Sequence, residues 1–198
     1  MALKELFRGA EAVIYEVNEK TLLKKRARKS YRIKELDEKL RKARTKNEIN
    51  LLRRASSAGV CVPKVSGIEK YSFKMDYVKG ELLKNYINAL DEKELNCLFM
   101  KVGRGINALH GNNIIHGDLT TSNMILSNGK VFFIDFGLGS LSCKAEDKAV
   151  DLHLIKQALI AKHNRVWRKC FETIKENYND AQVLERLKSV ERRGRKKS

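Results

Sequence analysis

Two short runs rich in β-branched and aromatic residues lie near the start of the chain, in residues 12–17 and 21–24. A polar turn at residues 18–20 separates them, and residues 71–78 form a third run of the same kind. Such runs bounded by polar turn residues are typical of β-strands. The first 78 residues are therefore predicted to contain a strand–turn–strand unit and at least one further strand.

Apolar residues change to a helical spacing in residues 32–58. Residues three or four apart share one face of a helix, and here the apolar positions are Ile33, Leu36, Leu40, Ile49, Leu52 and Ala55. We expect an interruption near Thr45, between the two groups of apolar positions. The only proline, Pro63, follows Gly59 and marks the end of this helical stretch.

A second helical stretch begins after Asp91, which has Glu94 three residues further on. This arrangement predicts a capping box, in which each side chain binds a backbone N–H of the first turn. Apolar residues then repeat at helical spacing as far as Gly111, at Leu95, Leu98, Phe99, Val102, Ile106 and Leu109.

A β-hairpin is predicted next, with strands at residues 124–126 and 131–134 joined through Asn128-Gly129. From Asp151 to about residue 190 the pattern is helical again. The order is strands with one long helix, a connector near residue 80, and then mostly helices around one hairpin. These elements predict an α+β fold.

Charge is concentrated in two places. The 198 residues carry a net charge of +17, and residues 20–54 hold fifteen Lys and Arg against four acids. Residues 186–198 hold seven against one, and the rest of the chain is balanced. Two basic blocks on a neutral body favour a polyanionic partner, although the first block is equally consistent with a solvated helix face that includes phosphate-binding residues.

The basic end of the chain has no apolar residue to bury and is expected to be a flexible tail over residues 191–198. Nucleic acid is the favoured partner, because neutralising phosphates releases counterions and needs no fixed fold. A nuclear address or a solubilising end are the alternatives. The tail residues with this role are Arg192, Arg193, Arg195, Lys196 and Lys197.

Composition excludes several classes of protein. With 42% hydrophobic and 33% charged residues, the chain is neither disordered throughout nor fibrous. No apolar run approaches a membrane span, and the first residues lack a signal-peptide core. The four cysteines form no C-x-x-C pair, which argues against zinc and a disulfide framework. We expect a protein of the cytoplasm, and also of the nucleus if the source is eukaryotic.

The densest polar cluster runs from His116 to Asn123 and is followed by Asp135. Asn123 enters the first hairpin strand and Asp135 leaves the second, so a tight turn brings these two residues together. Two hard oxygen donors, with Asp118 on the adjoining loop, suit a Mg²⁺ ion that holds a polyphosphate. Asp118 then remains to orient or deprotonate a hydroxyl nucleophile. His116 is expected to hold the loop.

These residues resemble the protein-kinase superfamily in the pattern H-G-D-L-x-x-x-N followed by D-F-G, with Gly117 where most members carry arginine. More narrowly, the chain resembles the kinase subunit of the KEOPS/EKC complex, also called the PRPK family. The motifs that carry this resemblance are Gly9-Ala10-Glu11-Ala12, Lys24-x-Arg26, Tyr31-Arg32, Arg44-Thr45-x-x-Glu48, His116 to Asn123, and the Arg-Gly-Arg-Lys-Lys ending.

The resemblance implies a role for several residues. Lys24 matches the strand lysine that contacts the nucleotide phosphates, with Lys25 as its rival on the other face of the strand. Glu48 matches the helix glutamate that pairs with this lysine, although Thr45-x-x-Glu48 also fits a capping box. Asp118 matches the catalytic aspartate, and Asn123 and Asp135 match the metal ligands.

Other matches concern the edges of the site. Residues Asp76 to Val78 match the connector that receives adenine through its backbone. Asp151 matches an aspartate that supports the catalytic loop, and it is placed at the start of a helix, where an ordinary N-cap is the alternative.

Two departures from the kinase pattern bear on the substrate. Only Gly9 remains of the glycine-rich loop, so the phosphates must be covered by the backbone of Ala10, Glu11 and Ala12, with Val13 ending the motif. Only thirteen residues separate Gly137 from Asp151. A conventional activation segment and peptide-docking platform cannot be built from them.

The resemblance implies a minimal bilobal kinase-like fold, with an N-lobe over residues 1–78 and a reduced C-lobe over residues 79–190. It implies an ATP-dependent serine/threonine-type kinase or ATPase that uses Mg²⁺, with Mn²⁺ as an alternative ion. The implied partners are KEOPS subunits, chiefly the metal-binding threonylcarbamoyl-transferase subunit, and tRNA. A RIO-like or small-molecule kinase and a catalytically idle RNA-binding scaffold are the alternatives.

Overall fold

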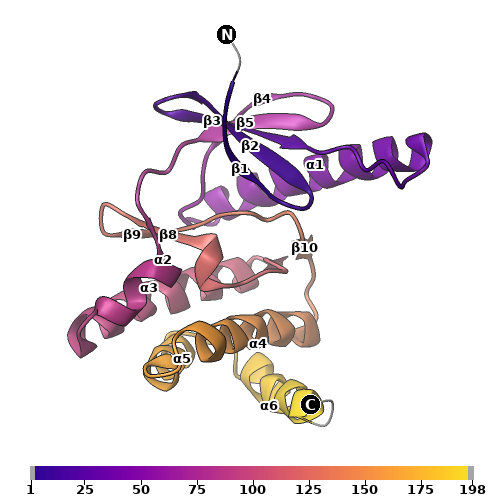
Figure 1. The fold of residues 1–198 in the computed structure, drawn as a ribbon. Helices are drawn as coiled ribbons and strands as arrows, with labels where there is room; N and C mark the ends of the chain where they lie inside the picture. Colours follow the sequence, from indigo (N-terminus) through magenta and orange to yellow (C-terminus); the bar gives the residue numbers. More distant parts are fainter. Residues whose placement is uncertain (1–2, 196–198) are drawn as a thin grey trace.

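The computed structural model describes residues 3–195. Its N-terminal part is an antiparallel five-stranded sheet in the order β1-β2-β3-β5-β4 (Figure 1). β3 lies at the centre, paired to β2 on one side and β5 on the other. The strands are β1 (Lys4–Arg8), β2 (Ala12–Asn18), β3 (Thr21–Arg26), β4 (Val65–Ile68) and β5 (Ser72–Asp76).

One long helix, α1 (Lys34–Ser57), lies against this sheet (Figure 1). The predicted interruption near Thr45 is wrong, because α1 runs unbroken through it. Thr45 is buried on the same side of the helix as Leu52 and Ala55, so a single continuous face packs inward. The alternative role of Glu48 in a capping box is also wrong, since Thr45 and Glu48 lie in the middle of the helix and not at its start.

A connector after β5 leads to β6 (Glu81–Leu82), the short helix α2 (Leu83–Tyr86) and the 3₁₀ turn η1 (Ile87–Ala89). The helix α3 (Glu92–Gly111) follows and begins with the predicted capping box, in which the Asp91 side chain accepts from the Glu94 N–H at 2.8 Å. β7 (Ile114–Ile115) and the 3₁₀ turn η2 (Thr121–Asn123) then carry the chain to the hairpin.

The predicted hairpin is present as β8 (Met124–Ser127) and β9 (Lys130–Phe133), with β6 added at the edge of β8. Asn128 and Gly129 have φ values of 48° and 71°, the pair of left-handed residues that a two-residue turn of this hand requires. The hairpin therefore brings the residue before β8 and the residues after β9 to the same end of the ladder.

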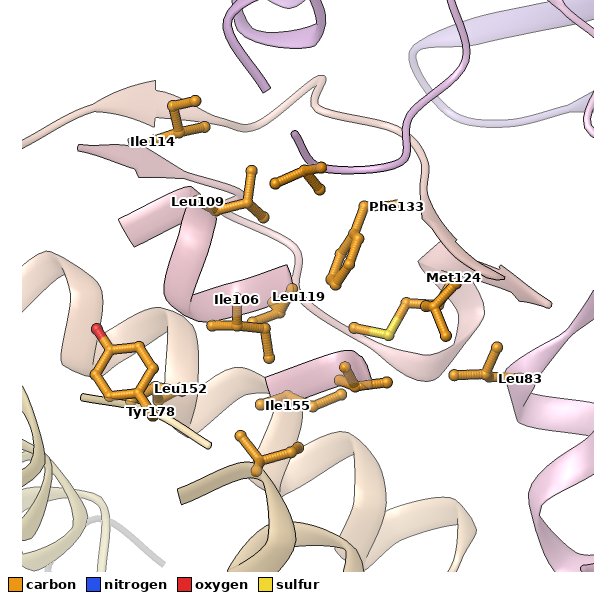
Figure 2. Packing of buried hydrophobic residues seen from close by; sticks show 14 of the residues in the cluster. Leu83, Ile106, Leu109, Ile114, Leu119, Met124, Phe133, Leu152, Ile155 and Tyr178 are labelled. Carbon is orange, nitrogen blue, oxygen red and sulfur yellow. The ribbon is translucent and has the colours of Figure 1, made fainter. Parts of the chain in front are cut away.

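The helices α4 (Ala145–Lys162), α5 (Trp167–Glu176) and α6 (Ala181–Arg195) complete the C-terminal part, and β10 (Ser140–Leu141) pairs with β7. Figure 2 shows their core, in which Leu119 lies near Ile106 and Ile155. Leu119 and Phe136 are fully buried. Because they neighbour Asp118 and Asp135, burial of apolar surface fixes the two polar loops in place.

Two sequence expectations differ from the structure in this region. Asp151 lies within α4, six residues after its start, and not at a helix N-cap. The expected flexible tail from residue 191 is helical as far as Arg195, because α6 continues and the Arg193 guanidinium pairs with Glu146 of α4. Lys196 and Lys197 lie outside the described residues. In residues 3–195, no helix is long and apolar enough to cross a membrane.

Candidate active site

Lys24 of β3 is the lysine that faces the site. Its Nζ lies 2.6 Å from Glu48 Oε1, and the residue is only 4% exposed. Lys25 is exposed, because side chains alternate between the two faces of a strand. The ion pair predicted between Lys24 and Glu48 is present, and Lys25 takes no part in it.

Arg26 binds the same glutamate, Glu48, and no motif in the sequence predicted this contact. Its guanidinium binds the second carboxylate oxygen of Glu48, and its exposed fraction is 4%. The sequence does contain a signal for this contact, because Arg26 lies two residues after Lys24 and residues two apart on a strand point to the same face. Glu48 thus holds two buried cations, and together with Asp135 it balances the charge of Lys24 and Arg26.

Asp135 follows β9 in a left-handed conformation, with φ of 61°. Its Oδ1 accepts from Lys24 Nζ at 2.8 Å and from the Gly137 N–H at 3.1 Å, while its side chain is about half exposed. Partial burial opposes ionisation, but the Lys24 ammonium and the Gly137 N–H outweigh it and lower the pKa of Asp135. The carboxylate is therefore charged at neutral pH.

Asp118 and Asn123 are joined directly. Asn123 Nδ2 donates to the Asp118 backbone oxygen and to Asp118 Oδ2, both at 2.8 Å. The turn η2 carries Asn123 back toward the loop, which is why two residues five positions apart meet. In the described part of the chain no donor contacts Asn123 Oδ1, so the amide presents this oxygen to a ligand.

The free oxygens fit a magnesium ion better than a metal that needs an all-protein site. Asn123 Oδ1 and Asp135 Oδ2 are hard donors, and Mg²⁺ takes its other ligands from water and phosphate. Within residues 3–195, no three His, Cys, Asp or Glu side chains converge to hold an ion by themselves. The residues present therefore suit Mg²⁺ that arrives with a phosphorylated ligand.

A cleft of about 210 Å³ lies between these groups and the turn that joins β1 to β2. Lys24, Asp118 and Asp135 line it, as do Gly9, Ala10, Glu11 and Ala12 from the turn. The turn is closed by a hydrogen bond from the Gly9 N–H to the Ala12 oxygen at 2.9 Å. The phosphate-binding residues expected from the sequence are thus gathered around one cavity.

Glu48 binds Lys24 from α1 without lining the cleft, and three other expected nucleotide residues lie away from it. Val13 is buried, and its neighbours Ala12 and Ile14 line the cleft in its place, because alternate residues of β2 face the cavity. The Asp76 carboxylate accepts from the Lys64 N–H at 3.2 Å. Val78 has no backbone hydrogen bond to any described residue, so its N–H and C=O remain available to a ligand at the connector.

Asp151 supports the catalytic loop from α4. Its carboxylate accepts from the backbone N–H of His116 at 2.7 Å and of Gly117 at 2.9 Å. His110 Nε2 is a third partner at 3.2 Å, and His110 Nδ1 lies 2.8 Å from the Tyr178 hydroxyl. No sequence pattern predicted His110 and Tyr178 at this site, because His110 comes from α3 and Tyr178 from the loop after α5, and only the tertiary fold brings them to Asp151.

His116 is fully buried and holds the loop as a neutral ring. Burial lowers its pKa and outweighs the opposing effect of Asp151. Its Nε2 lies 3.0 Å from the Ile134 oxygen, and its Nδ1 lies 3.3 Å from the Asp118 N–H. A neutral imidazole that donates from Nε2 and accepts at Nδ1 satisfies both bonds.

Gly117 has φ of 79°, and a Cβ added there would lie 2.3 Å from the Leu138 oxygen. The segment after Asp135 passes so close to the catalytic loop that no side chain fits. This contact explains why glycine stands where most kinases carry arginine.

Comparison with known proteins agrees with this geometry. The protein kinase domain family matches residues 2–155. The KEOPS complex subunit Bud32 of Pyrococcus abyssi is 41% identical, over 98% of this chain and 96% of that protein. The chain belongs to the Bud32 family. The Bud32 subunit of Encephalitozoon cuniculi is 40% identical, over 96% of this chain and 95% of that protein.

Another relative shows a Bud32-like segment within a longer protein. The probable bifunctional tRNA threonylcarbamoyladenosine biosynthesis protein of Methanobrevibacter smithii is 39% identical over 95% of this chain, which spans 36% of that protein. Among solved structures, WaaP in complex with acyl carrier protein matches with a TM-score of 0.67 and 14% identity, over 98% of this chain and 88% of that one. At this identity the likeness shows the kinase-like fold alone.

Proposed function

We propose that this chain binds ATP with Mg²⁺ and transfers the γ-phosphoryl group to a hydroxyl group or to water, as a subunit of a KEOPS complex. The observation that carries the proposal is the meeting of Lys24, Asp118 and Asp135 at one cleft, with Asn123 bonded to Asp118. Membership of the Bud32 family supports it. The structural likeness to an ADP-bound aminoglycoside phosphotransferase, with a TM-score of 0.60 and 15% identity, shows the fold alone and so does not favour a small-molecule substrate.

Each residue has a definite part in this reaction. Lys24 binds the phosphates and is itself held by Glu48. Asp118 orients the attacking O–H and accepts its proton as the new P–O bond forms and the bond to the β-phosphate oxygen breaks, which releases ADP. Bound Mg²⁺ neutralises phosphate charge, and Asn123 and Asp135 would hold it.

The acceptor is not selected by an activation segment of the usual kind. Only seven residues separate Gly137 from the start of α4 at Ala145, and two of them form β10, which pairs with β7. A peptide has no platform on this segment. This geometry supports an acceptor supplied within the complex, or water, in preference to a range of protein substrates.

Partners are inferred from the relatives and from charge. The relative from Methanobrevibacter smithii, named for tRNA threonylcarbamoyladenosine biosynthesis, contains a segment like this chain. We infer that the chain works beside the metal-binding threonylcarbamoyl-transferase subunit and contacts tRNA.

The α1 cationic face supports the contact with tRNA. We define it as Lys39, Lys42, Lys46 and Arg53, which are exposed at helical spacing and make no ion pair with any residue in 3–195. The last three border a groove of about 660 Å³ beside β4. Unpaired cations on a helix suit a phosphodiester backbone, because neutralising its phosphates releases counterions.

The test is turnover of γ-labelled ATP by the purified chain, with released phosphate and protein-bound label followed together. Asp118→Asn should lower turnover by about 10²–10⁴, because the amide cannot accept the proton. Glu92→Gln is the matched control, since Glu92 is exposed and lies on α3 away from the cleft. Full turnover in Asp118→Asn would contradict the proposal and favour an idle RNA-binding scaffold.

A further inference from the structure

The turn of residues 9–12 is held from outside the cleft by cations. Lys29 Nζ donates to the Ala10 oxygen. The Glu11 carboxylate accepts from Arg44 Nη1 at 2.5 Å and lies 3.7 Å from Arg32 Nη2. Kinases usually cover the phosphates with a flexible glycine-rich loop, whereas this turn has a single glycine and three cationic contacts.

Arg44 comes from α1, one turn before Glu48. Residues four apart lie on the same face of a helix, so α1 contacts the site through both. Glu48 binds Lys24, which touches the phosphates, and Arg44 binds Glu11 of the turn that covers them. Asn47 of the same helical turn donates to the Gly139 oxygen at 2.8 Å, beyond Asp135. Residues 44–48 of α1 therefore contact β3, the turn of residues 9–12 and the segment that follows Asp135.

The negative charge of Glu11 has to be neutralised by Arg44 if phosphates are to bind in the cleft. Glu11 lines the same cleft as Asp118 and Asp135, so a triphosphate entering there meets three carboxylates. Partial burial opposes ionisation, but Arg44 and Arg32 lower the pKa of Glu11, and it is charged at neutral pH. An unpaired Glu11 would repel the phosphates, whereas the Arg44 guanidinium neutralises the carboxylate and holds it against α1.

We propose that Glu11 and Arg44 are positioning residues, which hold the turn over the nucleotide phosphates and link its position to α1. This inference rests on the proposed function, because the turn that the two residues hold covers the same proposed nucleotide site. Neither side chain takes part in the chemical step. Their effect falls on the binding of ATP and only slightly on the rate of transfer.

The ion pair between Glu11 and Arg44 predicts the order of the KM values of three variants. Arg44→Gln leaves Glu11 charged with only the longer Arg32 contact at 3.7 Å. It should raise the KM for ATP about ten-fold with kcat within about two-fold, since each factor of ten corresponds to about 1.4 kcal/mol. Glu11→Gln loses the link but also the repulsion, and should raise KM about three-fold. The double variant should match Glu11→Gln, so that removing the carboxylate relieves most of the Arg44→Gln defect.

A second measurement does not depend on activity. Hydrogen exchange of the amides of residues 9–12, without nucleotide, should become faster in Arg44→Gln than in the unaltered chain. Arg54→Gln is the matched control, because it removes the same charge from an exposed position of α1 and its guanidinium contacts Asn50, away from Glu11 and the cleft. Arg54→Gln should leave both readouts unchanged.

The outcomes separate this inference from the function on which it rests. If the unaltered chain binds Mg-ATP and Lys24→Met abolishes binding, but Arg44→Gln behaves like Arg54→Gln, the positioning role is overturned and the function stands. Additive defects in the double variant would also overturn it. If the unaltered chain does not bind Mg-ATP, both proposals fail together.

Discussion

At the scale of single residues, the site is built around one buried carboxylate. Glu48 is 1% exposed and holds Lys24 and Arg26, one on each oxygen. A buried charge keeps its ionised form only while its partners compensate for lost hydration. Arg26 therefore supports the lysine that is proposed to contact the nucleotide, although the motif Lys24-x-Arg26 indicated no role for Arg26 itself.

Replacing Arg26 tests this arrangement. Arg26→Gln leaves half of a buried carboxylate unpaired, and the free energy of unfolding should fall by about 3 kcal/mol. Lys25→Gln, one position away on the exposed side of β3, should change it by less than about 0.5 kcal/mol. Urea unfolding followed by circular dichroism gives both values. Equal effects of the two substitutions would show that the buried contact contributes nothing.

At the scale of elements, the features that depend on neighbouring residues could be predicted from the sequence, whereas those that depend on tertiary contacts could not. The hairpin and the α3 capping box were predictable, because the signals for both lie within a few neighbouring residues. The bond from the Ile134 N–H, next to Asp135, to the Asn123 oxygen at 3.0 Å follows from the hairpin alone. The support of Asp151 by His110 depends on how two helices pack, and no spacing in the sequence encodes it.

The same distinction between local pattern and tertiary contact explains the predictions that differ from the structure. The apolar pattern of α1 weakens near Thr45, yet the helix continues, because Thr45 packs inward beside the sheet. Val13 was assigned to the nucleotide by motif position, whereas the register of β2 turns Ile14 toward the cleft. Motif spacing identified the correct strand, and only the pairing of the strands settled which face each residue occupies.

Three histidines between the catalytic loop and the end of α4 predict a dependence of stability on pH. Burial lowers the pKa of His116, His153 and His163 below the ordinary value of 6.5. The folded chain keeps these rings neutral where the unfolded chain binds protons, so unfolding takes up protons as pH falls below about 6.5. The free energy of unfolding should therefore decrease from pH 7.5 to 5.5, by up to about 1.4 kcal/mol per pH unit for each histidine.

Urea unfolding at pH 7.5, 6.5 and 5.5 measures this decrease. His116→Gln should reduce the slope, because it removes the most deeply buried of the three rings. The carboxylates with lowered pKa values, such as Asp135, titrate in a more acidic range and do not contribute in this window. A stability that stays constant over these pH values would contradict the prediction.

At the scale of the whole molecule, the net charge of +17 is divided between cations around the cleft, such as Lys24 and Arg26, and exposed cations on surfaces away from it. The α1 cationic face lies on the N-terminal lobe, and α6 ends at the opposite end of the molecule (Figure 1). Arg193 is already paired with Glu146. The exposed cations of α1 are therefore the better candidates for contact with phosphates among the described residues.

Salt dependence of tRNA binding tests this assignment. Lys42→Gln with Lys46→Gln should weaken binding and lower the slope of log K against log salt by about one for each lysine removed. Lys169→Gln with Lys175→Gln is the matched control, because both lysines of α5 already pair with glutamates. Filter binding of the complex at several salt concentrations measures the slopes. Equal slopes for the two double variants would exclude the α1 cationic face.

The missing side chain of Gly117 has a consequence for how the two lobes are joined. Because the α-carbon is bare, the backbone of Leu138 and Gly139 lies directly on the catalytic loop, and Gly139 in turn accepts the hydrogen bond from Asn47 of α1. This junction consists of main-chain atoms and one amide, none of which can be phosphorylated. The two halves of the site are therefore held together by one close backbone contact and one hydrogen bond, so a displacement of residues 138–139 would shift both halves at once.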